Sequence, residues 1–278
     1  MARGLHQRFQ IQGCVAKSRM AVVHLAFDPE NERHIALKRQ RPDLRDDPLI
    51  TSLFRHEQRL AETFSHPHIP QALETGVMDG DAYIAFEYVQ GHRLVDLLTQ
   101  INQDRRFVAI SQVWAIARGV ASALAYLHRP GLNESFPSGV HMDVCPHNIL
   151  LRENGDPLLI DFGISRSAWL APDVPVVLGR EAYVAPELFR GASPTPALDV
   201  FALGVLLHEA LLAKPLFRAA DRAQTFARIQ HAPISVPHLE RSSCPPELGS
   251  IVLRALARDP QRRFADGGEI LSALSAHM

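Results

Sequence analysis

The sequence predicts an α+β protein of two lobes, in which a small antiparallel sheet with one helix precedes a larger, mainly helical part. Residues 8–40 alternate apolar and polar side chains, as half-buried strands do, and residues 71–90 return to this pattern. Residues 48–64 instead repeat apolar side chains at helical spacing. Helical patterns dominate after residue 90, so the boundary between the lobes is expected near Gln90–Gly91.

The length of 278 residues fits a single domain over 1–278. We expect its first lobe at about 8–90 and its second at about 91–278. Helical patterns in the second lobe cover 94–101 and 111–128, the latter with Ser111 as its start signal, and they return from about residue 197. Two short strands are expected at 148–151 and 157–160.

The composition is typical of a soluble globular protein, with 46% apolar and 21% charged residues. A net charge of −1 gives no basic surface for nucleic acid or an anionic membrane, so neither is expected as a partner. The three cysteines lack C-x-x-C spacing, which argues against disulfides or a zinc site and favours the cytoplasm. The opening residues show no apolar stretch typical of a signal peptide, and the apolar run at 200–213 is too short to span a bilayer.

The helix predicted over 48–64 carries a carboxylate on its apolar face. Glu57 lies three residues after Phe54 and four after Leu53. A buried carboxylate is costly unless it is paired, so Glu57 needs a cationic partner elsewhere in the chain.

The stretch from His141 to Gly163 places two aspartates and an asparagine at fixed intervals. It reads HMDVCPHNIL and then LLIDFG, so that Asn148 follows Asp143 by five residues and Asp161 follows Asn148 by thirteen. Such a set can orient a hydroxyl nucleophile and hold Mg²⁺ against a nucleotide triphosphate.

This pattern resembles the catalytic loop and D-F-G segment of eukaryotic-type protein kinases, in particular bacterial Ser/Thr protein kinases. The resemblance spans roughly residues 9–276 and includes IALK at 35–38, APE at 185–187 and DPQRRF at 259–264. It implies the two-lobed protein kinase-like fold, with ATP in the cleft between the lobes and Mg²⁺ as the metal. The last two motifs separate the chain from kinases that act on small molecules.

The resemblance also implies roles for individual residues. Asp143 would orient the substrate hydroxyl, and Lys38 would hold the α- and β-phosphates while paired with Glu57. Asn148 and Asp161 would bind Mg²⁺. This pairing supplies the partner that Glu57 needs.

The adenine site follows from the same resemblance. Phe86 stands at the gatekeeper position, and the backbone of Glu87 and Val89 would face the base. The side chains that would sandwich the base are Val23, Ala36 and Leu150.

Three further contacts are implied within the second lobe. Glu187 would form a buried ion pair with Arg263. Asp199 would cap the backbone of the catalytic loop, and His141 would pack against Phe162.

The glycine-rich loop of the family has lost its glycines. Ala16, Ser18 and Ala21 stand at the three glycine positions, where backbone N–H groups approach phosphates in the family. Lys17 and Arg19, at the tip, either supply charge in place of those contacts or form a solvated turn.

The catalytic loop departs from the family as well. Met142 replaces the arginine that receives an activation-loop phosphate, and Cys145 replaces the lysine that steadies the γ-phosphate. Arg180 stands where a threonine usually contacts that lysine. In one interpretation, the Arg180 guanidinium replaces the charge lost at Cys145, which makes Arg180 catalytic. In the other, both positions have lost their catalytic function together. Cys145 is a redox-sensitive thiol or, as we expect, an inert small side chain.

The predicted function is ATP- and Mg²⁺-dependent phosphoryl transfer to Ser or Thr hydroxyls of a protein substrate. Between Gly163 and Ala185 the hydroxyl residues are Ser165, Ser167 and Tyr183, so activity is expected without activation-loop phosphorylation. The alternative is a pseudokinase that acts as a nucleotide-binding or protein-interaction scaffold, which the missing glycines favour. We expect any regulatory partner protein to be a separate chain.

Overall fold

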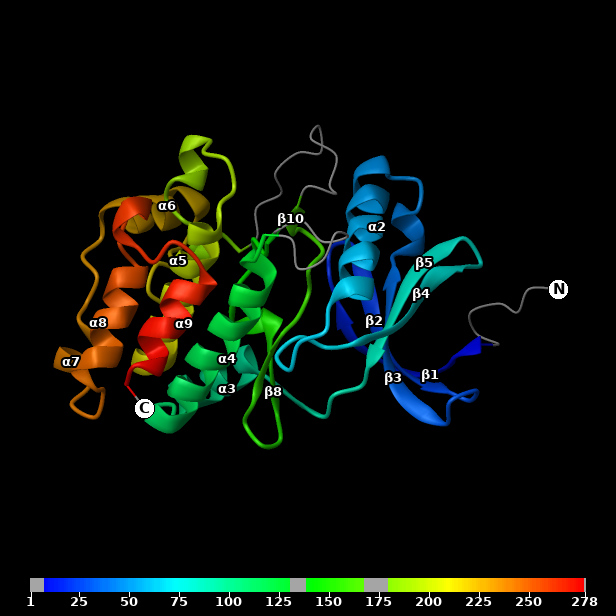
Figure 1. The fold of residues 1–278 in the computed structure, drawn as a ribbon, viewed down its shortest axis with the longest axis horizontal. Helices are drawn as coiled ribbons and strands as arrows, with labels where there is room; N and C mark the ends of the chain where they lie inside the picture. Colours follow the sequence, from blue (N-terminus) through cyan, green and yellow to red (C-terminus); the bar gives the residue numbers. More distant parts are fainter. Residues whose placement is uncertain (1–7, 131–138, 168–179, 278) are drawn as a thin grey trace. The chain divides into compact units, whose positions relative to one another are not determined.

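The computed structural model describes residues 8–130, 139–167 and 180–277 of the chain (Figure 1). The chain divides between Gln90 and Gly91 into two compact units. The first unit is an antiparallel sheet with a helix, and the second is mainly helical. These are the two lobes of the predicted fold, which is confirmed.

The first unit contains a five-stranded antiparallel sheet with the strand order β1-β2-β3-β5-β4. Its strands are β1 (Gln10–Lys17), β2 (Ala21–Asp28), β3 (Arg33–Gln40), β4 (Ala72–Met78) and β5 (Asp81–Glu87). Helix α2 (Pro48–Thr63) runs along this sheet (Figure 1). It begins where the Asp47 side chain accepts from the backbone N–H groups of Leu49 and Ile50, with Pro48 in the first turn.

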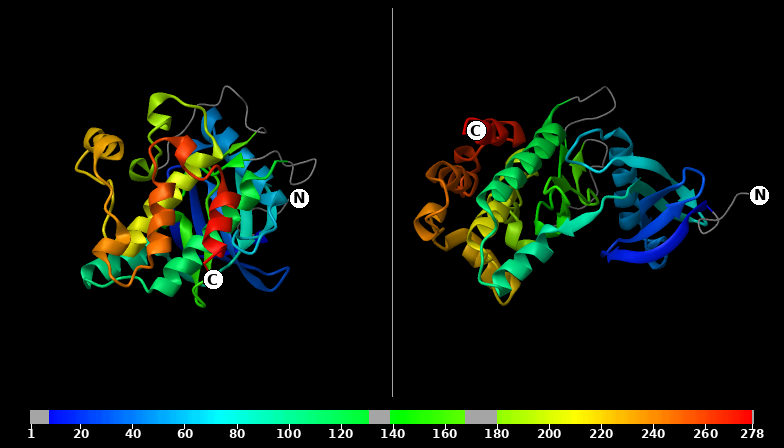
Figure 2. Two further views of the ribbon diagram at one scale, coloured as in Figure 1. Left: turned by 60° about the vertical axis from the view of Figure 1, so that its left-hand side comes forward. Right: turned by 90° about the horizontal axis from the view of Figure 1, so that it is seen from below.

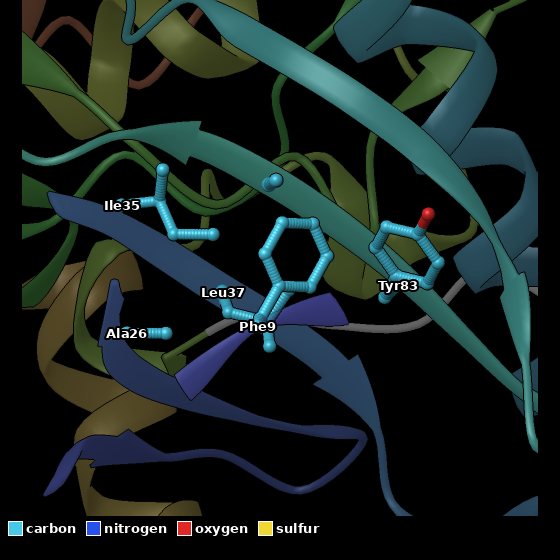
Figure 3. Close-up of a cluster of buried hydrophobic side chains, with 6 residues drawn as sticks. Phe9, Ala26, Ile35, Leu37 and Tyr83 are labelled. Carbon is cyan, nitrogen blue, oxygen red and sulfur yellow. The ribbon is translucent and has the colours of Figure 1, made fainter. Parts of the chain in front are cut away.

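The two faces of the sheet serve different purposes. One face carries a closed apolar cluster in which the Phe9 ring meets Tyr83 edge-on at 5.7 Å, around buried Ile35 and Leu37 (Figure 3). The register pairs Val23 with Lys38, and Lys38 with Ile84, so these side chains share the opposite face. On that face the sheet packs against α2.

The second unit is built around one buried helix. Helix α5 (Pro196–Leu212) is buried from Ala197 to Leu212. Helix α9 (Gly267–Ser275) lies against helix α4 (Ile110–His128), as Figures 1 and 2 show. The remaining elements of this unit are β6 (Gly91–Arg93), α3 (Leu94–Gln103), α4 (Ile110–His128), β7 (Gly139–Val140), β8 (Ile149–Arg152), β9 (Pro157–Leu159), β10 (Arg166–Ser167), α6 (Arg222–His231), α7 (Pro237–Glu240), α8 (Pro246–Ala255) and α9 (Gly267–Ser275).

The start signal proposed for α4 is wrong. The helix begins at Ile110 with Ala109 as its N-cap, and Ser111 lies inside the first turn. No side chain caps this end of the helix, and the first buried residue of the helix is Val113. By length and composition α4 could cross a bilayer, but more than half of its apolar stretch is buried within the protein, as in the core helix of a folded domain.

A buried ion pair joins two distant segments of the second unit, as predicted. Arg263 donates from Nη1 and Nη2 to the two carboxylate oxygens of Glu187, at 2.6 and 2.7 Å. The guanidinium also donates to the carbonyl oxygens of Ala257 and Ala197, and its side chain is fully buried. A pair so enclosed is costly to break, because the remaining charge loses its partner without regaining water.

Replacing Arg263 tests this dependence. We expect Arg263→Met to lower the free energy of unfolding by about 3–5 kcal/mol, because Glu187 is left buried and unpaired. Equilibrium denaturation in urea measures the change. The neighbouring Arg262, whose side chain is 82% exposed, offers a matched control: Arg262→Met should stay within about 0.5 kcal/mol of wild type. Equal stability of the two variants would contradict the expected dependence.

Candidate active site

A buried lysine–glutamate pair marks the site in the first unit. Lys38 on β3 donates from Nζ to both carboxylate oxygens of Glu57 on α2, at 2.5 and 2.7 Å. Both side chains are almost fully buried. The pairing predicted for Glu57 is therefore present, and it fixes the direction of the ammonium group.

The turn that replaces the glycine-rich loop is closed by its own serine. Ser18 donates its backbone N–H to the carbonyl oxygen of Ala21 at 2.8 Å, and its Oγ accepts from the N–H groups of Ala21 and Met20 at 3.0 and 3.4 Å. Three backbone N–H groups of the turn are thus already used. The side chains of Lys17 and Arg19 remain exposed at the tip, next to Ala16 at the end of β1.

The predicted adenine-binding positions fall at places that suit backbone recognition. The N–H of Glu87 donates to the carbonyl oxygen of Gln71 at 2.9 Å, so contact with adenine there would use the Glu87 carbonyl. Val89 follows β5 outside any regular element. Val23 and Ala36 are half-buried on the sheet face of Lys38, and Leu150 is half-buried on β8. Their roles in binding remain predictions.

In the second unit, a buried aspartate fixes the backbone of the catalytic loop through hydrogen bonds. Asp199 in the first turn of α5 accepts from the backbone N–H groups of His141 and Met142, at 2.7 and 2.9 Å. The predicted cap is confirmed. His128 at the end of α4 contacts the same carboxylate through Nε2 at 3.0 Å.

The ring of His128 is itself oriented by the last helix. Gly267 donates its backbone N–H to His128 Nδ1 at 3.0 Å, so Nε2 carries the proton donated to Asp199. A Cβ at position 267 would lie 2.3 Å from the backbone nitrogen of Ala125, so this close approach of α9 to α4 requires glycine. The sequence analysis did not identify His128 and Gly267. They are far apart in the chain, and no repeating pattern of residues connects them.

The catalytic loop brings Asp143 and Asn148 into direct contact. Asn148 donates from Nδ2 to Asp143 Oδ2 at 2.8 Å and to its carbonyl oxygen at 2.9 Å. Strands β8 and β9 pair, and Ile160 donates its N–H to the Asn148 carbonyl at 2.9 Å, which places Asp161 next to this asparagine in the fold.

The loop backbone is strained at two positions around these residues. Met142 and Asp161 have φ angles of 73° and 67°, in the left-handed region that non-glycine residues seldom occupy. Such strain persists where the surroundings enforce it and is frequent at active sites. His141 packs edge-on against Phe162 at 4.7 Å, as predicted, and burial lowers the pKa of its imidazole.

The donor set at Asn148 and Asp161 suits Mg²⁺. Both hydrogens of the Asn148 amide go to Asp143, so its Oδ1 is the atom that can serve a cation. Mg²⁺ prefers oxygen ligands and usually takes one or two carboxylates together with substrate phosphates. Among the residues described, no group of three or more His, Cys, Asp or Glu side chains could hold a metal ion. Water molecules and phosphate oxygens would complete the coordination of a metal held here.

Arg180 contacts Asp143 and Cys145 of the catalytic loop. Its backbone N–H and its Nη1 each lie 3.1 Å from an oxygen of Asp143, and Nη1 lies 3.4 Å from Cys145 Sγ. The guanidinium thus contacts both the Asp143 carboxylate and the Cys145 thiol. Burial raises the pKa of Asp143, and the positive charge of Arg180 opposes this rise.

Comparison with known proteins agrees with this geometry. The model of the protein kinase domain matches residues 11–275. The chain belongs to the protein kinase family. It is 33% identical over 96% of its length to a serine/threonine-protein kinase, drp72, of Corynebacterium efficiens, and 33% identical over 89% to the tyrosine-protein kinase MasK of Myxococcus xanthus. It is also 30% identical over 96% to the serine/threonine-protein kinase PknA of Corynebacterium glutamicum.

This kinase-family domain spans only part of the length of those relatives, namely 50% of the drp72 kinase, 39% of MasK and 56% of PknA. Within it, the structure brings together the predicted Asp143, Asn148, Asp161 and Arg180 in one unit, and Lys38 with Glu57 in the other.

The thiols of the kinase-family domain should differ in reactivity. Burial raises the pKa of Cys145 to about 12, with Asp143 adding to the effect, whereas Cys14 is exposed. We expect iodoacetamide at pH 8 to modify Cys14 and to spare Cys145 in the native protein, with mass spectrometry of peptides as the measurement. Both should react after denaturation. Alkylation of Cys145 in the folded protein would show that this thiol is not inert.

Proposed function

We propose that the domain transfers the γ-phosphoryl group of ATP to Ser or Thr hydroxyls of a protein substrate, with Mg²⁺. The observation that supports this most directly is the Asp143 carboxylate, oriented by Asn148 on one side and Arg180 on the other. The relatives include both serine/threonine- and tyrosine-protein kinases, and the choice of Ser or Thr follows from the resemblance of the chain as a whole.

The residues of the chain divide the work as follows. Asp143, ionised, accepts the proton of the substrate hydroxyl as its oxygen bonds to the γ-phosphorus and the bond to the β–γ bridging oxygen breaks, so that ADP leaves. Lys38, aimed by Glu57, holds α- and β-phosphate oxygens. Arg180 contacts the transferring group in place of the lysine lost at Cys145. Mg²⁺ held by Asn148 and Asp161 would neutralise the charge that develops on the phosphates.

We also propose that the domain is active without activation-loop phosphorylation. Ser165 is fully buried and donates to the His141 carbonyl at 3.3 Å, and Tyr183 is buried with its hydroxyl donating to Glu209 at 2.5 Å. Ser167 lies on β10, opposite Gly139. Residues 168–179, outside the described part of the chain, contain no hydroxyl side chain. Buried Met142 offers no charge to receive a phosphate.

One observation favours a second candidate, a pseudokinase that acts as a scaffold. The N–H groups of Ser18, Met20 and Ala21 are used within their own turn, so fewer remain for phosphate. Weak nucleotide binding would follow from this turn. The retained Lys38–Glu57 pair and the oriented Asp143 favour the enzyme.

Transfer from γ-labelled ATP with Mg²⁺ distinguishes the two candidates. We expect wild type to label itself or a generic protein substrate, before and after phosphatase treatment. Asp143→Asn should lose at least 100-fold in rate, because the amide cannot accept the proton. Stabilisation of both proteins by ATP and Mg²⁺, measured by thermal unfolding, controls for binding. Absence of label from wild type, with ATP still bound, would favour the pseudokinase.

The role of Arg180 has its own test. We expect Arg180→Ala to lower kcat by about 10- to 100-fold, since one charged contact to the transferring group is lost. Removing this charge should raise the pKa of Asp143 further, so the acidic limb of the pH–rate profile should move to higher pH. Arg180→Lys should recover part of the rate. If the pH–rate profile and the rate of Arg180→Ala equal those of wild type, Arg180 does not supply the positive charge that the family's lysine would provide at position 145.

A further inference from the structure

The helix that carries Glu57 is bonded to the sheet by the next residue along the chain. Gln58 on α2 is half-buried, and its amide nitrogen donates to the backbone carbonyl oxygen of Gly76 on β4 at 2.9 Å and to that of Tyr83 on β5 at 3.0 Å. One side-chain amide has two hydrogens, so this group can serve both carbonyls at once. Gln58 therefore bridges two neighbouring strands.

The bridge lies at the level of the sheet where Lys38 is found. Tyr83 pairs across the sheet with Arg39, the residue after Lys38. Two consecutive residues of α2 thus bind three adjacent strands, because Glu57 accepts from Lys38 on β3 and Gln58 donates to β5 and β4. A rotation of α2 about its axis would disturb both sets of contacts together.

The other contacts between α2 and the sheet restrict its rotation less. Phe54 and Ala61 pack in an apolar cluster with side chains of β5, and apolar contacts have no preferred direction. Thr75 on β4 donates to Glu62 on α2, but this hydrogen bond is exposed to solvent. Gln58 supplies directional and partly buried contacts immediately next to Glu57.

We propose that Gln58 is a positioning residue for phosphate binding, whose bridge fixes the rotation of α2 so that Glu57 faces Lys38 before a nucleotide arrives. Consecutive residues of a helix point about 100° apart around its axis, so fixing the direction of Gln58 fixes that of Glu57. Without the bridge, α2 would also populate orientations in which Glu57 turns away and no longer directs the Lys38 ammonium. This inference rests on the proposed function, because it concerns the phosphate-binding role of Lys38.

Binding of ATP and of adenosine separates this role from a merely structural one. Gln58→Met keeps a long side chain and removes the amide. Adenosine has no phosphates for Lys38 to hold, so we expect Gln58→Met to raise the Kd of ATP with Mg²⁺ about tenfold and to leave that of adenosine within about twofold, as measured by calorimetry. Arg59→Met, at the next and exposed position of α2, is the matched control and should bind both as wild type does. Equal weakening of both ligands, or of neither, would overturn the proposal.

Combination with a variant of the lysine tests whether Gln58 acts through Lys38. Lys38→Met alone should weaken the binding of ATP. Adding Gln58→Met should then weaken it no further, because residues that act through one contact are not additive. A second loss in the double variant, as large as the loss in Gln58→Met alone, would show that Gln58 does not act through Lys38.

The low lysine content of the chain allows a test without nucleotide. The chain contains three lysines, namely Lys17, Lys38 and Lys214. Lys38 is buried against Glu57, whereas Lys17 is exposed and serves as an internal standard. We expect Gln58→Met to increase the rate of reductive methylation of Lys38 relative to Lys17 about tenfold, followed by mass spectrometry of peptides, and Arg59→Met to leave this ratio unchanged. A ratio in Gln58→Met equal to that of wild type would show that the bridge does not hold the Lys38–Glu57 pair.

These measurements separate the inference from the proposed function, since none of them requires phosphate transfer. If wild type transfers no phosphate, but Gln58→Met selectively loses affinity for ATP and labels faster at Lys38, the positioning role stands and the phosphotransferase does not. If wild type transfers phosphate, and Gln58→Met binds ATP and labels as wild type does, the proposed function stands and this inference fails.

Discussion

The carboxylate of Asp199 determines the geometry on which the candidate site depends. It accepts the N–H groups of His141 and Met142, and so holds the backbone immediately before Asp143 in a strained conformation that the loop would not adopt alone. Asp199 is in turn held on α5, the buried helix of its lobe, and by His128 on α4. The position of Asp143 is therefore a property of the helical core.

Sequence patterns predicted the parts of the structure that follow from the spacing of apolar residues or from a buried charge that needs a partner. A carboxylate on an apolar helix face required a partner, and Lys38 provides it for Glu57. The antiparallel sheet and its helix followed from alternation and helical spacing. The start of α4 was misplaced at Ser111, because serine is compatible with both the cap and the first turn of a helix.

Other features depend on contacts that no pattern encodes. The hydrogen bond from Gly267 to His128 joins residues that are 139 positions apart in the chain. The use of three N–H groups by the Ser18 turn depends on a side-chain conformation.

The link between α9 and the catalytic loop has a consequence for the order in which the protein matures during synthesis. The chain emerges from the ribosome from its N-terminus, so the segment carrying Asp143 is exposed long before Gly267 is made. Until then His128 lacks the donor that orients its ring, and the brace through Asp199 is incomplete. A nascent chain can thus fold its sheet and present Lys38 early, while the loop that would perform the chemistry reaches its final geometry only as translation of the domain ends.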